Sequence, residues 1–153
     1  VLELGTFTGY SAISMGLALQ PGAKLHTIEA FDELEEVIVT YIEKAGLTDV
    51  VVPHFGQALE LIPSLDETFD LVFIDADKRE YTAYYHAVFD KVRSGGYILA
   101  DNILWDGKVV DPTQNNDPQT KGILEFNQTV QNDPRVENVI LPIRDGMMLV
   151  RKK

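Results

Sequence analysis

Three oxygen-bearing side chains directly follow two apolar segments of the chain. Asp75 comes after Phe-Asp-Leu-Val-Phe-Ile, and Asp101 and Asn102 come after Gly-Gly-Tyr-Ile-Leu-Ala. If the two segments are neighbouring strands of a parallel sheet, these side chains converge at one edge of it. Carboxylate and amide oxygens, without cysteine or a nearby histidine, suit a hard cation such as Mg²⁺ or Ca²⁺. The alternative is that each aspartate only caps a helix or begins a turn.

A lysine follows the first of these acids closely enough to share the same site. Lys78 lies three residues after Asp75, and a lysine beside a bound cation loses its proton more readily than one in water. Lys78 is therefore a candidate general base, although most lysines are solvated surface residues. The histidines, by contrast, are isolated along the chain and have no ligand spacing, so we interpret them as ordinary surface or packed residues: His26, His54 and His86.

A loop containing two glycines lies near the start of the chain, in Glu-Leu-Gly-Thr-Phe-Thr-Gly-Tyr-Ser. Its spacing differs from the Gly-x-Gly-x-x-Gly of dinucleotide binders, and Tyr10-Ser11 replaces the Lys-Ser/Thr of a phosphate-binding loop. Gly5 and Gly9 let a ligand approach the backbone closely, while the Glu3 carboxylate suits an amino group better than a pyrophosphate. The loop therefore favours a nucleoside that carries an amino acid, the alternative being a simple turn of the chain.

An acidic residue ends the second apolar segment. Glu29 lies at about the distance beyond the loop at which a carboxylate accepts hydrogen bonds from ribose hydroxyls in nucleotide-binding folds. Its two oxygens match two vicinal hydroxyl groups. A solvated strand end is the alternative interpretation of Glu29.

The elements that must position these residues follow an alternating pattern. Strand-like segments, separated by helix-length stretches, are expected at residues 1–4, 24–28, 50–53, 71–74 and 97–100. This pattern predicts a parallel sheet with right-handed crossovers. Two late strands, 136–141 and 147–150, are predicted on either side of a turn at Asp145-Gly146.

Helices are predicted from apolar positions that recur every three to four residues. One covers 11–19, one runs from an N-cap at Asp32 to Gly46, one runs from about Glu80 to Ser94-Gly95-Gly96, and one covers 119–130. The apolar stripe of the second helix comprises Leu34, Val37, Ile38, Tyr41, Ile42 and Ala45. Residues 105–118 predict a surface loop, because this stretch is polar and is interrupted by Gly107, Pro112 and Pro118.

Composition narrows the class of protein. The chain has 153 residues, of which 45% are hydrophobic and 24% charged, as expected for one soluble α/β domain. The net charge of -11 disfavours a nucleic-acid partner. No apolar run approaches the roughly 20 residues that span a bilayer, and the absence of cysteine agrees with a cytoplasmic enzyme. Because the chain opens at Val1 inside a strand-like segment, we expect it to be part of a longer protein.

Three motifs in order resemble the catechol and caffeoyl-coenzyme A O-methyltransferase family: Val-Leu-Glu-Leu-Gly-Thr-Phe-Thr-Gly-Tyr-Ser, Phe-Ile-Asp-Ala-Asp-Lys and Ala-Asp-Asn-Ile-Leu-Trp-Asp-Gly-Lys-Val-Val-Asp-Pro. The resemblance covers essentially the whole chain and implies a single domain over residues 1–153. It implies a Rossmann-like class I methyltransferase fold, with a mostly parallel seven-stranded sheet, an antiparallel last strand and helices on both faces. Members of this family usually carry helices ahead of the first motif, which support dimerisation. We expect this chain to lack those helices and the full-length protein to be a homodimer.

The resemblance also implies a reaction and a set of roles. A methyl group would pass from S-adenosylmethionine to a hydroxyl of a catechol-like small molecule, assisted by Mg²⁺ or by Ca²⁺ or Mn²⁺. Asp75, Asp101 and Asn102 would bind the metal, and Lys78 would abstract the acceptor proton. The residues implied to hold the cofactor are Glu3, Gly5, Thr6, Gly9 and Ser11 around its methionine part, Glu29 at the ribose, Gln57 and Ala58 at the adenine, and Asp77.

Three other functions compete with this one. A tRNA hydroxyuridine O-methyltransferase is disfavoured by the acidic charge of the chain. A cofactor-binding module without catalysis is disfavoured because the metal-type ligands and Lys78 are all present. A nucleotide-dependent oxidoreductase is disfavoured by the missing central glycine and by Glu3. The sequence does not identify the acceptor or the hydroxyl that is methylated.

Overall fold

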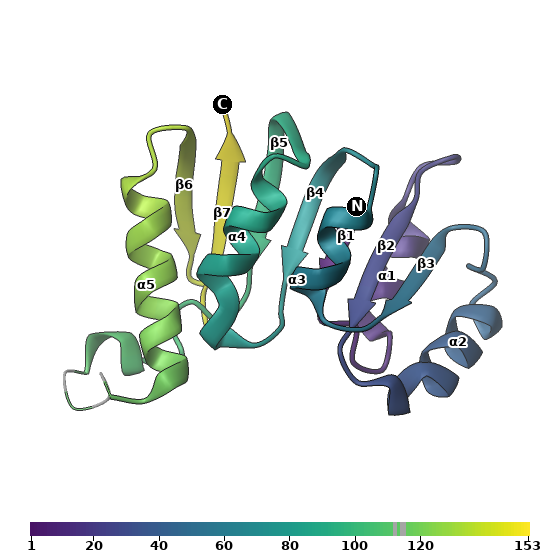
Figure 1. Cartoon of the computed structure of the whole chain (residues 1–153), viewed down its shortest axis with the longest axis horizontal. Coiled ribbons are helices and arrows are strands. Elements are labelled where there is room, and N and C mark those ends of the chain that lie inside the picture. Colours follow the sequence, from purple (N-terminus) through teal and green to yellow (C-terminus); the bar gives the residue numbers. More distant parts are fainter. Residues whose placement is uncertain (112, 114–115) are drawn as a thin grey trace. The chain divides into compact units, whose positions relative to one another are not determined.

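The computed structural model describes residues 1–111, 113 and 116–153, and it contains two compact units, Val1–Asp66 and Glu67–Lys153 (Figure 1). Pro112, which the sequence places in a loop, lies outside the described residues. Among the residues that the structure describes, no helix combines the length and the apolar character needed to cross a bilayer.

The first unit contains three parallel strands and three α-helices. Strands β1 (Leu2–Leu4), β2 (Leu25–Glu29) and β3 (Val51–Phe55) pair in parallel, with β2 between the other two. The helices are α1 (Tyr10–Ala18), α2 (Glu35–Lys44) and the short α3 (Ala58–Leu61). The predicted strands are confirmed, with ends that differ by one or two residues, whereas α3 was not predicted.

Helices α1 and α2 pack into one apolar core with β2 and β3. The buried members of this core are Ala12, Leu25, Ile38, Ile42, Leu47 and Val51. The predicted apolar stripe of α2 includes two residues that do not belong to the buried face, because Val37 and Tyr41 are 37% and 52% exposed. The predicted N-cap is also wrong. Asp32 begins a separate 3-10 turn, η1 (Asp32–Leu34), and α2 starts only at Glu35.

The second unit contains four strands: β4 (Phe69–Ile74), β5 (Val92–Ala100), β6 (Val136–Leu141) and β7 (Met147–Lys152). Strand β4 pairs in parallel with β5, whereas β7 lies between β5 and β6 and is antiparallel to both (Figure 1). The predicted late strands and the antiparallel last strand are therefore confirmed. The predicted turn at Asp145-Gly146 is confirmed as well, with Gly146 at φ 79°.

The helices of the second unit are α4 (Tyr81–Phe89) and α5 (Pro118–Asn132), with 3-10 turns η3 (Lys78–Glu80) and η4 (Lys108–Val110). The prediction that the helix from about Glu80 ends at Ser94-Gly95-Gly96 is wrong, because α4 ends at Phe89 and these residues lie inside β5. Gly95 has φ 74°, and the register between β4 and β5 shifts at this level. The glycines thus accommodate an irregular strand rather than a helix end.

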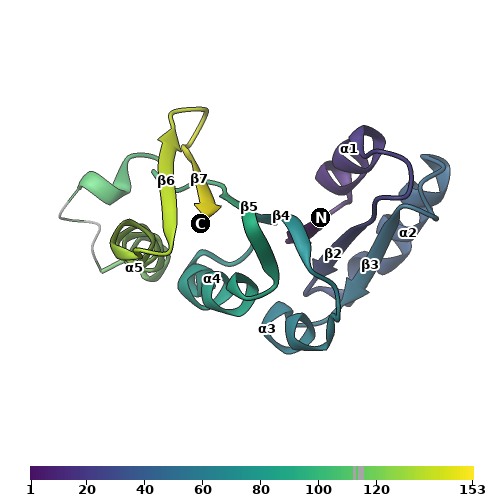
Figure 2. The same cartoon turned by 90° about the horizontal axis from the view of Figure 1, so that it is seen from above.

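Helices α4 and α5 pack against each other on one side of the second unit's strands (Figure 2). Their contact is aromatic: Tyr81 meets Phe126 edge to face, with ring centroids 5.5 Å apart. At Gly122 the backbone of α5 comes so close to η3 that a Cβ atom would lie 2.3 Å from the Lys78 carbonyl oxygen. Only glycine permits this approach, which places η3, and Lys78 with it, directly against α5.

Candidate functional site

The two predicted metal-binding aspartates directly follow the paired ends of β4 and β5. Ile74 and Ala100 are register partners at the ends of β4 and β5. Asp75 and Asp101 are the next residues, and the Asp101 N–H donates to the Ile74 carbonyl at 3.0 Å. The expectation that these strands are neighbours whose acidic ends converge is confirmed.

The third predicted ligand follows in a tight turn. Asn102 has φ 58°, a left-handed conformation that asparagine tolerates better than most residues. Its N–H donates to Asp101 Oδ1 at 2.7 Å. The next two N–H groups donate to the carbonyls of Gly146 and Asp145 at 3.1 and 3.0 Å, which anchors the turn to the β6–β7 loop. This arrangement fixes the Asn102 backbone directly beside the Asp101 carboxylate.

The donor set at this sheet edge fits a hard divalent cation. Within the described part of the chain, no group of three or more histidine, cysteine, aspartate or glutamate side chains is arranged to hold a metal ion. The predicted ligand set is accordingly two carboxylates, Asp75 and Asp101, together with the amide of Asn102. Two carboxylates and one amide leave coordination positions open for water or substrate, as Mg²⁺ commonly requires.

Lys78 is brought to the same place, as predicted. The residue is only 7% exposed, and its Nζ donates to Asp75 Oδ1 at 2.7 Å. The ammonium also lies over two aromatic rings, 5.0 Å from the centroid of Tyr81 and 6.0 Å from that of Trp105. Lys78 is therefore a buried part of the acidic cluster, and the alternative of a solvated surface lysine is wrong.

One member of this cluster could not be recognised from sequence patterns. Tyr81 is fully buried, and its hydroxyl lies 3.2 Å from the Ile74 carbonyl and 3.1 Å from the Asp101 carbonyl. Burial, reinforced by the Asp75 and Asp101 carboxylates, raises the pKa of Tyr81 far above its ordinary value. In the sequence, Tyr81 looked like one of several apolar residues on a helix face.

Asp77 is the one residue of the second unit that the resemblance assigns to the cofactor, and it forms an ion pair with Arg79. Its Oδ1 accepts hydrogen bonds from the Arg79 backbone N–H at 3.0 Å and from Arg79 Nε at 2.9 Å. These bonds with Arg79 hold the pKa of Asp77 below its usual value. A cofactor contact at Asp77 would therefore add to this ion pair or replace it.

The glycine loop of the first unit surrounds a buried carboxylate. Glu3 is fully buried, and its Oε2 accepts a hydrogen bond from Thr27 Oγ1 at 2.5 Å. Thr27 Oγ1 also lies 2.5 Å from the Thr6 hydroxyl. Gly5 and Gly9 adopt φ values of 98° and 87°, which side chains disfavour. The structure thus brings together Glu3, Gly5, Thr6 and Gly9, while Ser11 lies in the first turn of α1.

Backbone N–H groups, rather than solvent, hold the Glu29 carboxylate in place. The residue is 5% exposed, and its Oε2 and Oε1 accept the N–H groups of Phe7 at 2.7 Å and Phe31 at 3.0 Å. The alternative of a solvated strand end is therefore wrong. Each carboxylate oxygen keeps a lone pair that suits a ribose hydroxyl. The Gly56 N–H donates to the Glu29 carbonyl at 2.8 Å. Gln57 and Ala58, at the start of α3, are the next two residues after Gly56 in the chain.

Two histidines that are isolated in the sequence form a pair in the structure. His26 Nδ1 and His54 Nε2 lie 3.0 Å apart, and the two rings stack with centroids at 5.3 Å. Parallel pairing of β2 with β3 brings them together. Both are packed residues outside the predicted site, in agreement with their interpretation, and their pairing with each other is the feature that the sequence did not predict. His86 lies on α4, where its ring tilts against Tyr85.

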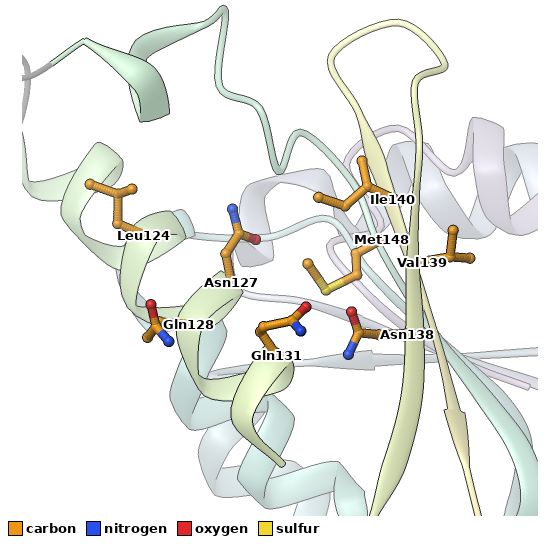
Figure 3. Close-up of a pocket in the computed structure, with 8 residues that line it drawn as sticks. All are labelled: Leu124, Asn127, Gln128, Gln131, Asn138, Val139, Ile140 and Met148. Atoms are coloured by element: carbon orange, nitrogen blue, oxygen red, sulfur yellow. The ribbon is translucent and has the colours of Figure 1, made fainter. Parts of the chain in front are cut away.

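A groove of about 450 Å³ lies elsewhere in the second unit, between α5 and the β6–β7 hairpin (Figure 3). Four amide side chains, Asn127, Gln128, Gln131 and Asn138, line it together with four apolar ones. No lining residue is ionisable, and none is a predicted site residue. The groove therefore lacks the acid–base or metal-binding groups present at the ends of β4 and β5.

Comparison with known protein families connects these features to an enzyme class. The model of a family described as O-methyltransferase matches residues 1–153. Caffeoyl-CoA O-methyltransferase 2 of Eucalyptus globulus is 38% identical over 99% of this chain, and caffeoyl-CoA O-methyltransferase 5 of Nicotiana tabacum is 35% identical over the same share. The chain covers 66% and 68% of these two relatives, or about two thirds of their length.

Solved structures show the same likeness. An O-methyltransferase from Bacillus cereus in complex with SAH is 33% identical with a TM-score of 0.93, and 99% of this chain covers 73% of it. The O-methyltransferase TomG from Streptomyces achromogenes, involved in tomaymycin synthesis and solved with SAM, is 30% identical with a TM-score of 0.92. For TomG the coverage is 99% of this chain and 72% of that protein. These likenesses confirm the predicted Rossmann-like α/β fold with mostly parallel strands.

Proposed function

The chain belongs to the O-methyltransferase family, and on that premise we propose that its protein transfers a methyl group from S-adenosylmethionine to a hydroxyl oxygen of a catechol-like small molecule. A divalent cation, Mg²⁺ in the first place and Ca²⁺ or Mn²⁺ as alternatives, assists the reaction. The observation that carries this proposal is the joint position of Asp75, Asp101, Asn102 and Lys78 at the ends of two paired strands.

The first unit supplies all but one of the residues proposed for the methyl donor. When bound, S-adenosylmethionine supplies an electrophilic methyl group on its sulfonium. Glu3, with Gly5 and Thr6 following it in the chain, suits the charged amino group, and the Glu29 oxygens suit the two ribose hydroxyls. The SAM and SAH complexes of two relatives at 30% and 33% identity support this donor. Asp77, which belongs to the second unit, completes the proposed set, and its carboxylate also binds Arg79.

The second unit supplies the residues for the acceptor. When bound to Asp75, Asp101 and Asn102, Mg²⁺ supplies Lewis acidity toward two adjacent hydroxyls and so favours their ionised form. Lys78 is the proposed general base that receives the proton of the attacking hydroxyl. The surrounding rings of Tyr81 and Trp105 restrict the Lys78 side chain. Fixing the nucleophile in line with the methyl group supplies several kcal/mol of barrier reduction.

The acceptor class rests on two observations. The caffeoyl-CoA O-methyltransferases that resemble this chain support a phenolic acceptor, and a metal site with open positions suits a chelating pair of neighbouring hydroxyls. A tRNA acceptor fits less well, because a chain of net charge -11 repels the phosphate backbone. The single-domain organisation, the homodimer and the cytoplasmic location stay predictions.

The test is to incubate the full-length protein with methyl-labelled S-adenosylmethionine, a panel of catechols and bulk tRNA. We expect the label in the catechols. Asn102→Ala should greatly reduce this transfer, whereas Asn132→Ala, an exposed asparagine at the end of α5, should leave it unchanged. Label in tRNA, or in no acceptor at all, would contradict the proposed acceptor class.

A further inference from the structure

The Tyr81 side chain lies against the carboxyl ends of β4 and β5, the two strands that precede the acidic cluster. We propose that Tyr81 is a positioning residue that fixes the ends of β4 and β5, and through them the spacing of the metal ligands Asp75 and Asp101. This inference rests on the proposed function, because it concerns the geometry of the metal site assigned there.

The hydroxyl of Tyr81 contacts both strand ends at once. It lies 3.2 Å from the Ile74 carbonyl, directly before Asp75, and 3.1 Å from the carbonyl of Asp101 itself. The Ile74 carbonyl also accepts the Asp101 N–H at 3.0 Å. One hydroxyl proton is thus shared between two backbone acceptors of the residues that define the site. Without it, the Asp101 carbonyl loses this donor and the two ends are joined by one hydrogen bond fewer.

The ring of Tyr81 is itself held in place. It meets the ring of Phe126 on α5 edge to face, at 5.5 Å between centroids and an interplanar angle of 83°. The Lys78 Nζ lies 5.0 Å from the centroid of the same Tyr81 ring. Tyr81 therefore links α5, the ends of β4 and β5, and the side chain of the proposed base. Its hydroxyl position is set by packing rather than by solvent.

A second tyrosine one turn along α4 separates this role from ordinary core packing. Tyr85 is also fully buried and also packs against Phe126, at 6.2 Å. Its hydroxyl, however, donates to Asp133 Oδ2 at 2.9 Å, beyond the end of α5 and away from the acidic cluster. Removing the Tyr85 hydroxyl deletes a partly buried hydrogen bond to Asp133, whereas removing the Tyr81 hydroxyl deletes the contacts with the strand ends that carry the metal ligands.

The experiment compares Tyr81→Phe with Tyr85→Phe, using Mn²⁺ alone as the probe and electron paramagnetic resonance to count free Mn²⁺. Tyr81→Phe should weaken Mn²⁺ binding about 3- to 10-fold, the factor that corresponds to one lost hydrogen bond. Tyr85→Phe should stay within about twofold of the wild type, as should the affinity of both variants for S-adenosylmethionine. Equal Mn²⁺ affinities for Tyr81→Phe and the wild type, or equal losses in both variants, would overturn the role of Tyr81.

A metal-free measurement gives a second readout. Amide hydrogen exchange of Asp101 and Asn102 should be about 3- to 10-fold faster in Tyr81→Phe than in the wild type, and unchanged in Tyr85→Phe. Unchanged exchange in Tyr81→Phe overturns the inference. Wild-type protein that does not bind Mn²⁺ saturably overturns the proposed metal site itself. Saturable wild-type binding with an unaffected Tyr81→Phe overturns only the positioning role.

Discussion

Gly122→Ala places a methyl group against the backbone that carries Lys78. The new Cβ would lie 2.3 Å from the Lys78 carbonyl oxygen and 2.8 Å from the Arg79 Cα, whereas ordinary contacts begin near 3.5 Å. Both neighbours are backbone atoms of η3, so no side-chain rotation relieves the overlap. The turn must therefore move by about 1 Å, which carries Lys78 away from its present position.

The expected magnitude follows from this displacement. Overpacking costs about 1–3 kcal/mol, and the higher helix propensity of alanine offsets at most about 1 kcal/mol of that. With the full offset, about 0–2 kcal/mol of destabilisation remains, which for a chain of this length lowers Tm by up to roughly 8 °C. A 1 Å misplacement of a reacting group lowers turnover by about 10²-fold. Thermal melting and methyl transfer from labelled S-adenosylmethionine to catechol measure the two effects.

Gly16→Ala is the matched control for this prediction. Gly16 is also a buried helical glycine, but its new Cβ would meet side-chain atoms, Val51 Cγ2 at 2.9 Å and Leu47 Cδ1 at 3.1 Å, which can rotate away. We expect little change in turnover for this variant at saturating S-adenosylmethionine. Wild-type Tm and turnover in Gly122→Ala would refute the reasoning, and so would an equal loss of turnover in Gly16→Ala.

Three further predictions concern single side chains. Glu29→Ala should weaken S-adenosylmethionine binding by roughly 1–3 kcal/mol, and an unchanged affinity by calorimetry would exclude the ribose contact. Lys78→Arg keeps the positive charge, but arginine cannot act as a base near neutral pH. Turnover should therefore fall on the order of 10²–10⁴-fold. Wild-type turnover in this variant would show that Lys78 is not the base. Arg135 holds the pKa of Asp133 well below its usual 3.8, so this carboxylate stabilises the fold above that pH and stops doing so as the pH falls through the lowered value. Asp133→Asn should therefore lower Tm at pH 7, and a deficit in Tm that does not shrink below about pH 3.8 would contradict the assignment.

The acidic cluster could be predicted from the sequence because its signal is local. An apolar run that stops at Ile74 or Ala100 and continues with a carboxylate marks a strand end in a parallel sheet. The strand ends and the Asp75–Lys78 contact are therefore confirmed. Helix boundaries were less predictable, since Asp32 and the glycines at 95 and 96 carry cap-like signals that the structure uses in a 3-10 turn and inside a strand.

The residues that escaped prediction depend on pairings between distant elements. Tyr81 contacts the Asp101 carbonyl twenty residues away, and Gly122 contacts η3 across more than forty positions. The His26–His54 pair requires the register of β2 with β3. Periodicity places each of these residues on a helix or strand, but it does not identify the partner that each one contacts.

The central claim is that one hydroxyl of a neighbouring pair is methylated with the help of a divalent cation. The most direct measurement is methyl transfer by the full-length protein to catechol and to phenol, each with Mg²⁺, after EDTA treatment, and after Mg²⁺ is restored. The metal-assisted reaction predicts turnover of catechol with Mg²⁺, loss of that turnover in EDTA, recovery with added Mg²⁺, and little turnover of phenol throughout. Catechol turnover that is unaffected by EDTA, or equal turnover of phenol and catechol, would contradict it.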